Sequence, residues 1–181
     1  MQPHRHNSFL LVLVFAFAWL AALPARSDEA CMDFKWDVSK ERALFAGTPA
    51  ASTAGKDAKS APIVVPNRFY SIRLASQGGV KFAASPAKNA AGASAYAGLV
   101  TLKISAPGGY RISVDLPLWI DAVSNGQLLG ASDFQGQHEC AAPQKIVQFD
   151  LSGTGPFILQ LSSAKSDHVL LTVTPAPPRK L

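Results

Sequence analysis

The chain has 181 residues, of which 48% are hydrophobic, and its formal net charge is +5. This length and composition allow a single domain with a core of its own. The basic residues are scattered except for Arg179 and Lys180, whereas a nucleic-acid-binding protein gathers them in a stripe or patch. We therefore interpret the charge as a contribution to solubility and expect no nucleic-acid partner.

Residues 1–27 have the three parts of a secretory signal peptide. Arg5 gives a positive start, residues 9–23 form an apolar run, and Pro24 and Ser27 belong to a cleavage site. The run has 15 residues, fewer than the about 20 that a membrane-spanning helix needs. Cleavage after Ser27 would leave 154 of the 181 residues, with 15 basic and 12 acidic side chains. We predict a periplasmic or secreted protein with no membrane span after cleavage.

The two cysteines of the chain are Cys31 and Cys140. An even number of cysteines in an oxidising compartment favours a disulfide between them. It would close a loop of roughly 110 residues and constrain the unfolded chain by about 4–5 kcal/mol. Lipidation of Cys31 is not expected, because Asp28 and Glu29 precede it in place of a box of small residues.

Residues 33–46 are the only segment with a convincing helical pattern. Asp37 or Ser39 is the expected N-cap, and Gly47 and Pro49 end the helix. An isolated helix of this length is marginal, so we expect packing against the rest of the protein to hold it.

Residues 47–61 are small or polar and include no large apolar side chain. Such a composition cannot offset the entropy of ordering through burial, so we predict a flexible surface linker. The expected organisation is a helix and linker over 28–61, a β-sandwich domain over 62–175 and a disordered, proline-rich tail over 176–181.

From residue 62 onward the sequence consists of short alternating segments separated by turns. The expected strands are 69–74, 80–82, 99–104, 110–114, 118–123, 128–132, 146–151, 157–161 and 168–173. Asn125-Gly126 is a strong hairpin signal, and the turn at 106–109 predicts a second hairpin over 98–115. Short connections favour antiparallel pairing. The prediction is an all-β, antiparallel β-sandwich, of jelly-roll or immunoglobulin-like type, with one short N-terminal helix.

The polar residues do not supply an obvious catalytic or metal site. A zinc site would need His138, His168 and both cysteines to converge. Ser132 and Asp133 lie close to His138 in the sequence, but no Gly-x-Ser-x-Gly motif is present. We predict no catalytic residue, no metal and no cofactor, and we interpret His138 as an exposed histidine in an anchoring loop around Cys140.

Two other groups bear on carbohydrate chemistry. Asp115 and Asp121 flank Pro117 and are candidates for a carboxylate pair, although solvated strand-end carboxylates are the favoured interpretation. Tyr96 and Trp119 are the candidate ligand-binding aromatics, with Tyr96 the better placed to be exposed because it follows a small-residue loop.

Four segments resemble a family of small exported β-sandwich proteins from proteobacteria, whose members are largely uncharacterised. These are CMDFKWDVSKERALFAG (31–47), GGYRISVDLPLWIDAV (108–123), HECAAPQKIVQFDL (138–151) and FILQLSSAKSDHVLLTV (157–173). The last part of the chain is similar, more weakly, to bacterial pre-peptidase C-terminal domains. The resemblance implies a β-sandwich fold and an exported protein, and it brings no active site.

The predicted function is therefore a non-enzymatic binding or accessory role in the bacterial envelope, with an envelope protein or a glycan as partner. A carbohydrate-binding module is the alternative. A small metal-binding or hydrolytic protein is less favoured because few suitable residues are available.

Overall fold

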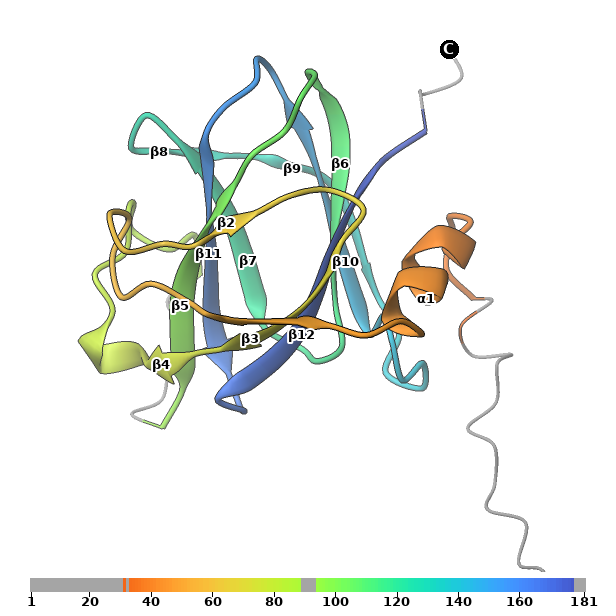
Figure 1. Ribbon diagram of the computed structural model, residues 1–181, viewed down its shortest axis with the longest axis horizontal. Coiled ribbons are helices and arrows are strands. Elements are labelled where there is room, and N and C mark those ends of the chain that lie inside the picture. Colours follow the sequence, from red (N-terminus) through yellow and green to blue (C-terminus); the bar gives the residue numbers. More distant parts are fainter. Residues whose placement is uncertain (1–30, 32, 89–93, 178–181) are drawn as a thin grey trace, which may run out of the picture.

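The computed structural model describes residues 31, 33–88 and 94–177, which form 12 strands and one α-helix, α1 (Ser39–Phe45). The strands make two sheets that face one another, with α1 outside one of them (Figure 1). The all-β sandwich with one short N-terminal helix is confirmed. The predicted signal peptide and tail residues 178–181 lie outside the described residues.

The first sheet, here called sheet A, has the strand order β1–β3–β12–β6–β10–β9. In that order its strands are Ala50–Thr53, Phe69–Arg73, His168–Pro175, Gly108–Val114, Lys145–Leu151 and Ala131–Gly136. Every described pair of neighbours is antiparallel except β1 with β3, which is parallel.

The second sheet, sheet B, has the order β2–β5–β11–β7–β8, and β4 also pairs with β5. Its strands are β2 (Ile63–Val64), β4 (Ala75–Ser76), β5 (Tyr96–Leu102), β7 (Trp119–Ser124), β8 (Gln127–Leu129) and β11 (Phe157–Ala164). Here β2 and β5 are parallel, and the other described pairs are antiparallel.

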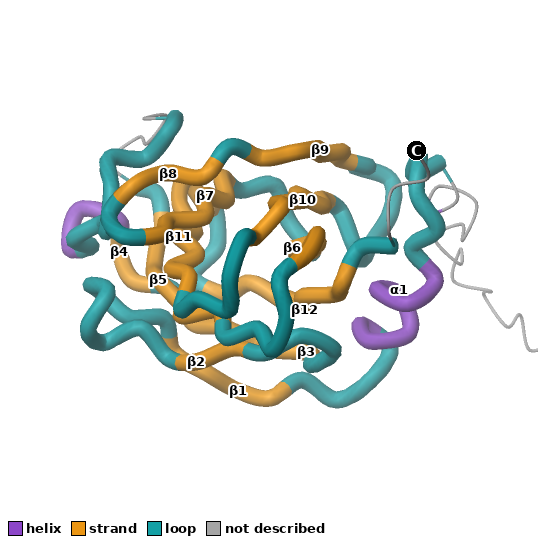
Figure 2. The backbone as a smooth tube through the Cα atoms, turned by 90° about the horizontal axis from the view of Figure 1, so that it is seen from above, coloured by secondary structure: helices purple, strands orange, loops and turns teal. Residues whose placement is uncertain are grey.

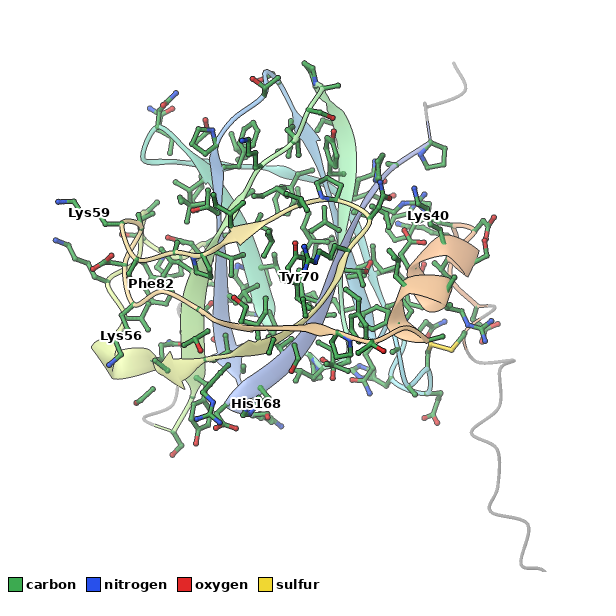
Figure 3. The ribbon with its side chains drawn as sticks, in the orientation of Figure 1. Lys40, Lys56, Lys59, Tyr70, Phe82 and His168 are labelled. Carbon is green, nitrogen blue, oxygen red and sulfur yellow. A yellow bond between two sulfur atoms is a disulfide. The ribbon has the colours of Figure 1, made fainter. Side chains whose placement is uncertain are left out.

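The main core lies between the sheets and consists of the inward-facing half of each alternating strand. Phe149 and Leu171 of sheet A and Leu159 of sheet B are almost completely buried in it. Tyr70 also lies there (Figure 3), and its hydroxyl accepts a hydrogen bond from the Val65 N–H at 3.0 Å. The buried phenol is therefore not left without a polar partner.

The two hairpin predictions have opposite outcomes. The Asn125-Gly126 hairpin is confirmed: β7 and β8 pair, and both turn residues have the positive φ that a two-residue turn requires. The hairpin over 98–115 is wrong, because β5 belongs to sheet B and β6 to sheet A. Alternation correctly placed residues of both strands in the core, but they reach it from opposite sheets.

The short strand expected at 80–82 is not formed. A 3-10 helix at Gln77–Gly79 precedes it, and the chain then passes over the outer face of sheet B. There the Ala84 N–H donates to Gln160 Oε1 at 2.9 Å. Within the expected strand itself, the Lys81 N–H donates to the Lys56 carbonyl at 2.7 Å, and this loop contact takes the place of strand pairing.

The predicted linker over 47–61 needs correction, because it contributes β1 to sheet A and therefore belongs to the sandwich. After β1 the chain passes to sheet B, where Gly55 forms an antiparallel bridge with Leu99. We call residues 53–55, together with 73–75 where β3 passes to β4, the closed side. Figure 2 shows β1 and β2 along this side and β8 and β9 along the opposite one.

The closed side requires small residues. A Cβ atom added to Gly98 would lie 2.3 Å from the Cβ of Ala54, and one added to Gly55 would lie 2.5 Å from the Ala61 nitrogen. The small-residue composition that suggested a linker is thus what lets two main chains approach closely.

Helix α1 covers part of the outer face of sheet A beside β12 (Figure 1). It begins at Ser39 and not at residue 33, after a turn in which Asp37 Oδ1 accepts the Ser39 N–H at 2.9 Å. Val38 occupies the N-cap position and makes no side-chain cap bond, so neither expected residue is the N-cap. The ring centroids of Phe45 and Phe69 lie 5.3 Å apart, which fixes the helix against β3.

A buried ion pair lies beneath α1. Glu41 is 2% exposed, its Oε1 lies 3.8 Å from Arg111 Nη1, and it accepts a hydrogen bond from the Thr174 hydroxyl. The Arg111 guanidinium also donates to the Asp37 carbonyl and lies 4.9 Å from the centroid of the Trp36 ring. Each charge has partners, so removing either would leave the other buried and uncompensated.

In the described part of the chain, no helix is long and apolar enough to span a membrane.

Candidate functional site

On the side opposite the closed side, a hollow lies between β7 of sheet B and strands β9 and β10 of sheet A. We call it the edge hollow. Its volume is about 330 Å³, which is within the range of small-ligand sites. It is lined mainly by apolar residues, with a few polar groups: Pro117, Trp119, Ile120, Ala131, Phe134, Gly136, His138, Gln144, Lys145 and Val147.

Phe134 is the unusual residue of the edge hollow, because this large apolar residue is 66% exposed. It lies opposite Val147, a main-core residue, so it occupies the inward-facing register of β9. Its neighbours Asp133 and Gln135 point the other way and contact Lys35. Phe134 is therefore directed towards the interior, but β9 is the edge strand, and among the described residues no further strand covers the ring.

Trp119 and Lys145 form the polar wall of the hollow. The Trp119 indole N–H donates to Asp121 Oδ1 at 2.8 Å, which fixes the ring. Lys145 Nζ donates to the Leu118 carbonyl at 2.7 Å and lies 5.1 Å from the centroid of the indole ring. The ammonium group of Lys88 lies 5.5 Å from the same centroid. Two cations thus lie close to one aromatic ring.

The environment of Lys145 lowers the pKa of its ammonium group. Burial is the main cause, the nearby Lys88 charge adds to it, and the Asp121 carboxylate acts in the opposite direction. The ordinary pKa of a lysine side chain is 10.5. A pKa below it means that burial has removed part of the hydration of the ammonium group and that no full counter-charge has replaced it. An anion bound in the hollow would supply that counter-charge.

The loop over 137–144 forms a further wall and is held at several points. The Gln137 N–H donates to the Gln144 carbonyl at 2.7 Å, and the Cys140 N–H donates to the Gln137 carbonyl at 3.2 Å. Cys140 is fully buried and forms the predicted disulfide with Cys31, seen in yellow in Figure 3. His138 is exposed, as predicted for a loop histidine, and it also lines the hollow.

The structure does not bring the two predicted ligand-binding aromatics together. Both are half-buried, but Tyr96 packs against the main core, in the same register of β5 as Val100. Trp119 lies opposite Ser162, in the outward-facing register of β7. They face opposite sides of sheet B and cannot form one sugar-stacking platform; only Trp119 lines the edge hollow.

The other candidate groups are engaged elsewhere. The hydroxyl of Ser132 donates to the Gln148 carbonyl at 3.3 Å, and Asp133 pairs with Lys35. Asp115 follows β6 in sheet A and accepts the Leu170 N–H, whereas Asp121 lies in sheet B. Within the described residues, no three His, Cys, Asp or Glu side chains gather in a way that could hold a metal ion.

Sequence reasoning missed three residues around the hollow, namely Phe134, Lys145 and Lys88. The sequence did indicate that Phe134 could be exposed, because it is the one aromatic residue in the polar segment Ser-Asp-Phe-Gln-Gly, which offers no apolar neighbours to bury it. The proximity of the two lysines to Trp119 depends on the packing of distant segments, which no local pattern reveals.

No family model matches the chain, and no curated protein or solved structure is significantly similar to it. The resemblance to an exported β-sandwich family therefore stays a prediction.

Proposed function

We propose that this is an exported, non-enzymatic binding protein of the bacterial envelope, whose edge hollow accepts an apolar group of its partner. The observation that carries the proposal is the 66% exposure of Phe134 beside an apolar hollow. Apolar surface left in water costs about 25 cal/mol per Å², so covering this ring on binding is favourable. Exposed apolar surface that adjoins a hollow is typical of interaction sites.

The polar groups of the hollow support binding more than catalysis. The described residues of its lining include one imidazole, one ammonium and one amide, and no carboxylate, hydroxyl or thiol. These groups can orient a ligand, whereas nucleophilic catalysis needs a nucleophile held beside its base. The disulfide supports an oxidising location, which agrees with the expected signal peptide.

Binding can be tested with anilinonaphthalene sulfonate, an apolar and anionic dye that brightens in dry sites. We expect saturable fluorescence with the protein purified from the periplasm. Ala131→Trp, which fills the hollow, should weaken binding at least tenfold. Ile63→Ser is the matched control, because Ile63 is 62% exposed on β2, away from the hollow. Equal dye binding by the three proteins, each folded by circular dichroism, would refute the proposal.

The proposed location has a separate test. Cell fractionation and mass spectrometry of the intact protein should find a periplasmic or secreted chain that begins at residue 28. A full-length chain confined to the cytoplasm would contradict export.

The alternative, a carbohydrate-binding module, is favoured only by Trp119, a half-buried indole that lines the hollow. Two ammonium groups already lie near this ring, which hinders stacking of a neutral sugar. A glycan array would support the alternative if it gave hits that Trp119→Ala abolishes and Ile63→Ser retains.

A further inference from the structure

We infer that the partner is an extended peptide segment that adds a strand to β9 and places an apolar side chain, flanked by an acidic residue, in the edge hollow. This inference rests on the proposed function and names the chemistry of the partner.

The first support is the exposed edge of β9. In the part of the chain that the structure describes, this strand ends sheet A and pairs on one side only, with β10. Natural edges are usually protected by lysine, proline or a bulge. The sequence of β9, Ala-Ser-Asp-Phe-Gln-Gly, contains neither lysine nor proline. It does carry a bulge, because Ser132 is an extra residue between Ala131 and Asp133, which pair with the consecutive residues Phe149 and Gln148. Beyond this bulge residues 133–136 pair regularly, and this part of the edge can serve as a template for another strand.

The second support is the difference between the two faces of β9. On the outer face, Gln135 Oε1 accepts the Lys35 N–H and its amide donates to the Asp33 carbonyl, both at 2.9 Å. Asp133 pairs with Lys35 on the same face. On the inner face, Phe134 is exposed. At the backbone edge, the Phe134 N–H donates to Asp133 Oδ1 at 2.9 Å, and an added strand would replace this bond by a strand-pairing one. Such a strand would find the outer face occupied and an apolar hollow on the inner side.

The third support is charge complementarity. Lys145 and His138 line the hollow, and the ammonium group of Lys88 lies 5.5 Å from the centroid of the Trp119 ring. The nearby Asp121 carboxylate is already bonded to the Trp119 indole. A carboxylate of the peptide, next to its apolar side chain, could pair with Lys145 and reverse the depression of its pKa. A second copy of the chain is a poorer occupant, because two-fold pairing through β9 would bring the same lysines towards one another.

The test uses three short synthetic peptides and isothermal titration calorimetry. The first has a central leucine between two glutamates in an alternating valine and threonine sequence. The second replaces the glutamates with lysines, and the third keeps the acidic sequence but carries alternate backbone N-methyl groups that block strand pairing. We expect the first to bind at least tenfold more tightly than either of the others.

Protein variants locate the interaction. Phe134→Ser and Lys145→Met should each lower the affinity for the acidic peptide at least fivefold, and Ile63→Ser should leave this affinity unchanged. Phe134 is largely exposed, so its replacement should not impair folding.

Two outcomes would overturn the peptide inference. In one, the dye binds the hollow but the acidic and N-methylated peptides bind equally or not at all, which leaves the proposed function standing. In the other, sedimentation shows a concentration-dependent dimer that Phe134→Ser abolishes, and the occupant is then a second copy. If neither the dye nor any of the peptides binds, the proposed function itself is refuted.

Discussion

The two long sides of the sandwich have the same kind of chain crossing but differ in how tightly they are packed. On both, the chain leaves one sheet and enters the other: at residues 53–55 and 73–75 on the closed side, and at Gly130 between β8 and β9 on the other. The closed side has small residues in direct contact, whereas the other leaves the edge hollow and an exposed Phe134. The same sheet crossing therefore stabilises the fold where it is fully packed, and where it is not it leaves the hollow that we propose binds a partner.

The two sides also differ in what holds them. The closed side depends on close approach of main chains around Gly98 and Ala54. The wall of the edge hollow at 137–144 is instead tied by the Cys31–Cys140 disulfide. An incompletely packed region thus gains its order from a covalent bond, whereas the closed side gains it from close packing.

The largest effect is expected from the disulfide. Its cysteines are 109 residues apart, so replacing both by serine should lower the free energy of unfolding by about 4 kcal/mol, chiefly by freeing the unfolded chain. Urea unfolding measures the loss, with the reduced wild-type protein as control. Hydrogen exchange should quicken at 137–144 and stay slow at 53–55; equal loss on both sides would contradict the comparison.

Gly98→Ala should have the next largest effect. The new methyl group would meet Ala54 at 2.3 Å, and overpacking of this kind costs about 1–3 kcal/mol. Urea unfolding of Gly98→Ala, Ala54→Gly and the double variant forms a double-mutant cycle. We expect the double variant to recover most of the loss. A stable Gly98→Ala protein would show that the closed side is looser than its geometry indicates.

Phe134→Ser should scarcely change stability, within about 0.5 kcal/mol, because the ring is already in water. Phe149→Ala in the main core, where the ring is 1% exposed, should cost about 3–5 kcal/mol. The pair is compared by thermal unfolding. A large loss of stability for Phe134→Ser would mean that the ring is packed in solution. The edge hollow would then not be an open site.

The smallest effect concerns pH. The folded-state pKa of Lys145 lies below its unfolded value of 10.5. At a pH between these two pKa values, the unfolded chain therefore binds more protons than the folded protein. Stability from this group therefore rises as pH increases through that window. Relative to Lys145→Met, the wild-type protein should gain stability from neutral to alkaline pH. The gain is small because the ammonium is only half-buried and is screened by solvent. Lys103→Met, at an exposed position, is the charge-matched control for urea unfolding, and an unchanged difference across this range would contradict the prediction.

Alternation in the sequence predicted which residues face the core but not which strands pair. Ile112 and Leu102 are both buried as expected, yet they belong to different sheets, because a period of two fixes the face of a residue and not its partner strand. The Asn125-Gly126 hairpin was predictable because its turn is encoded locally. Strand β1 was not, since Ala-Ala-Ser-Thr has no apolar pattern and is held by backbone pairing with β3.

The edge hollow was only partly predictable. Trp119 was selected as a ligand-binding residue and lines the hollow, but for a stacking role that the adjacent lysines hinder. The importance of Phe134 depends on β9 being an edge strand, and that of Lys145 on its burial beside Trp119. Both are properties of the assembled sheets, which one sequence does not display.

The position of β12 has a consequence for when the protein can fold. This late strand lies between β3 and β6, so the early strands β1 and β3 join the rest of sheet A only through residues 168–175. While the ribosome still holds those residues, sheet A cannot be completed. Pairing between such distant segments is intrinsically slow. A sheet that remains open until β12 arrives would suit passage through a membrane before folding, as the proposed export requires.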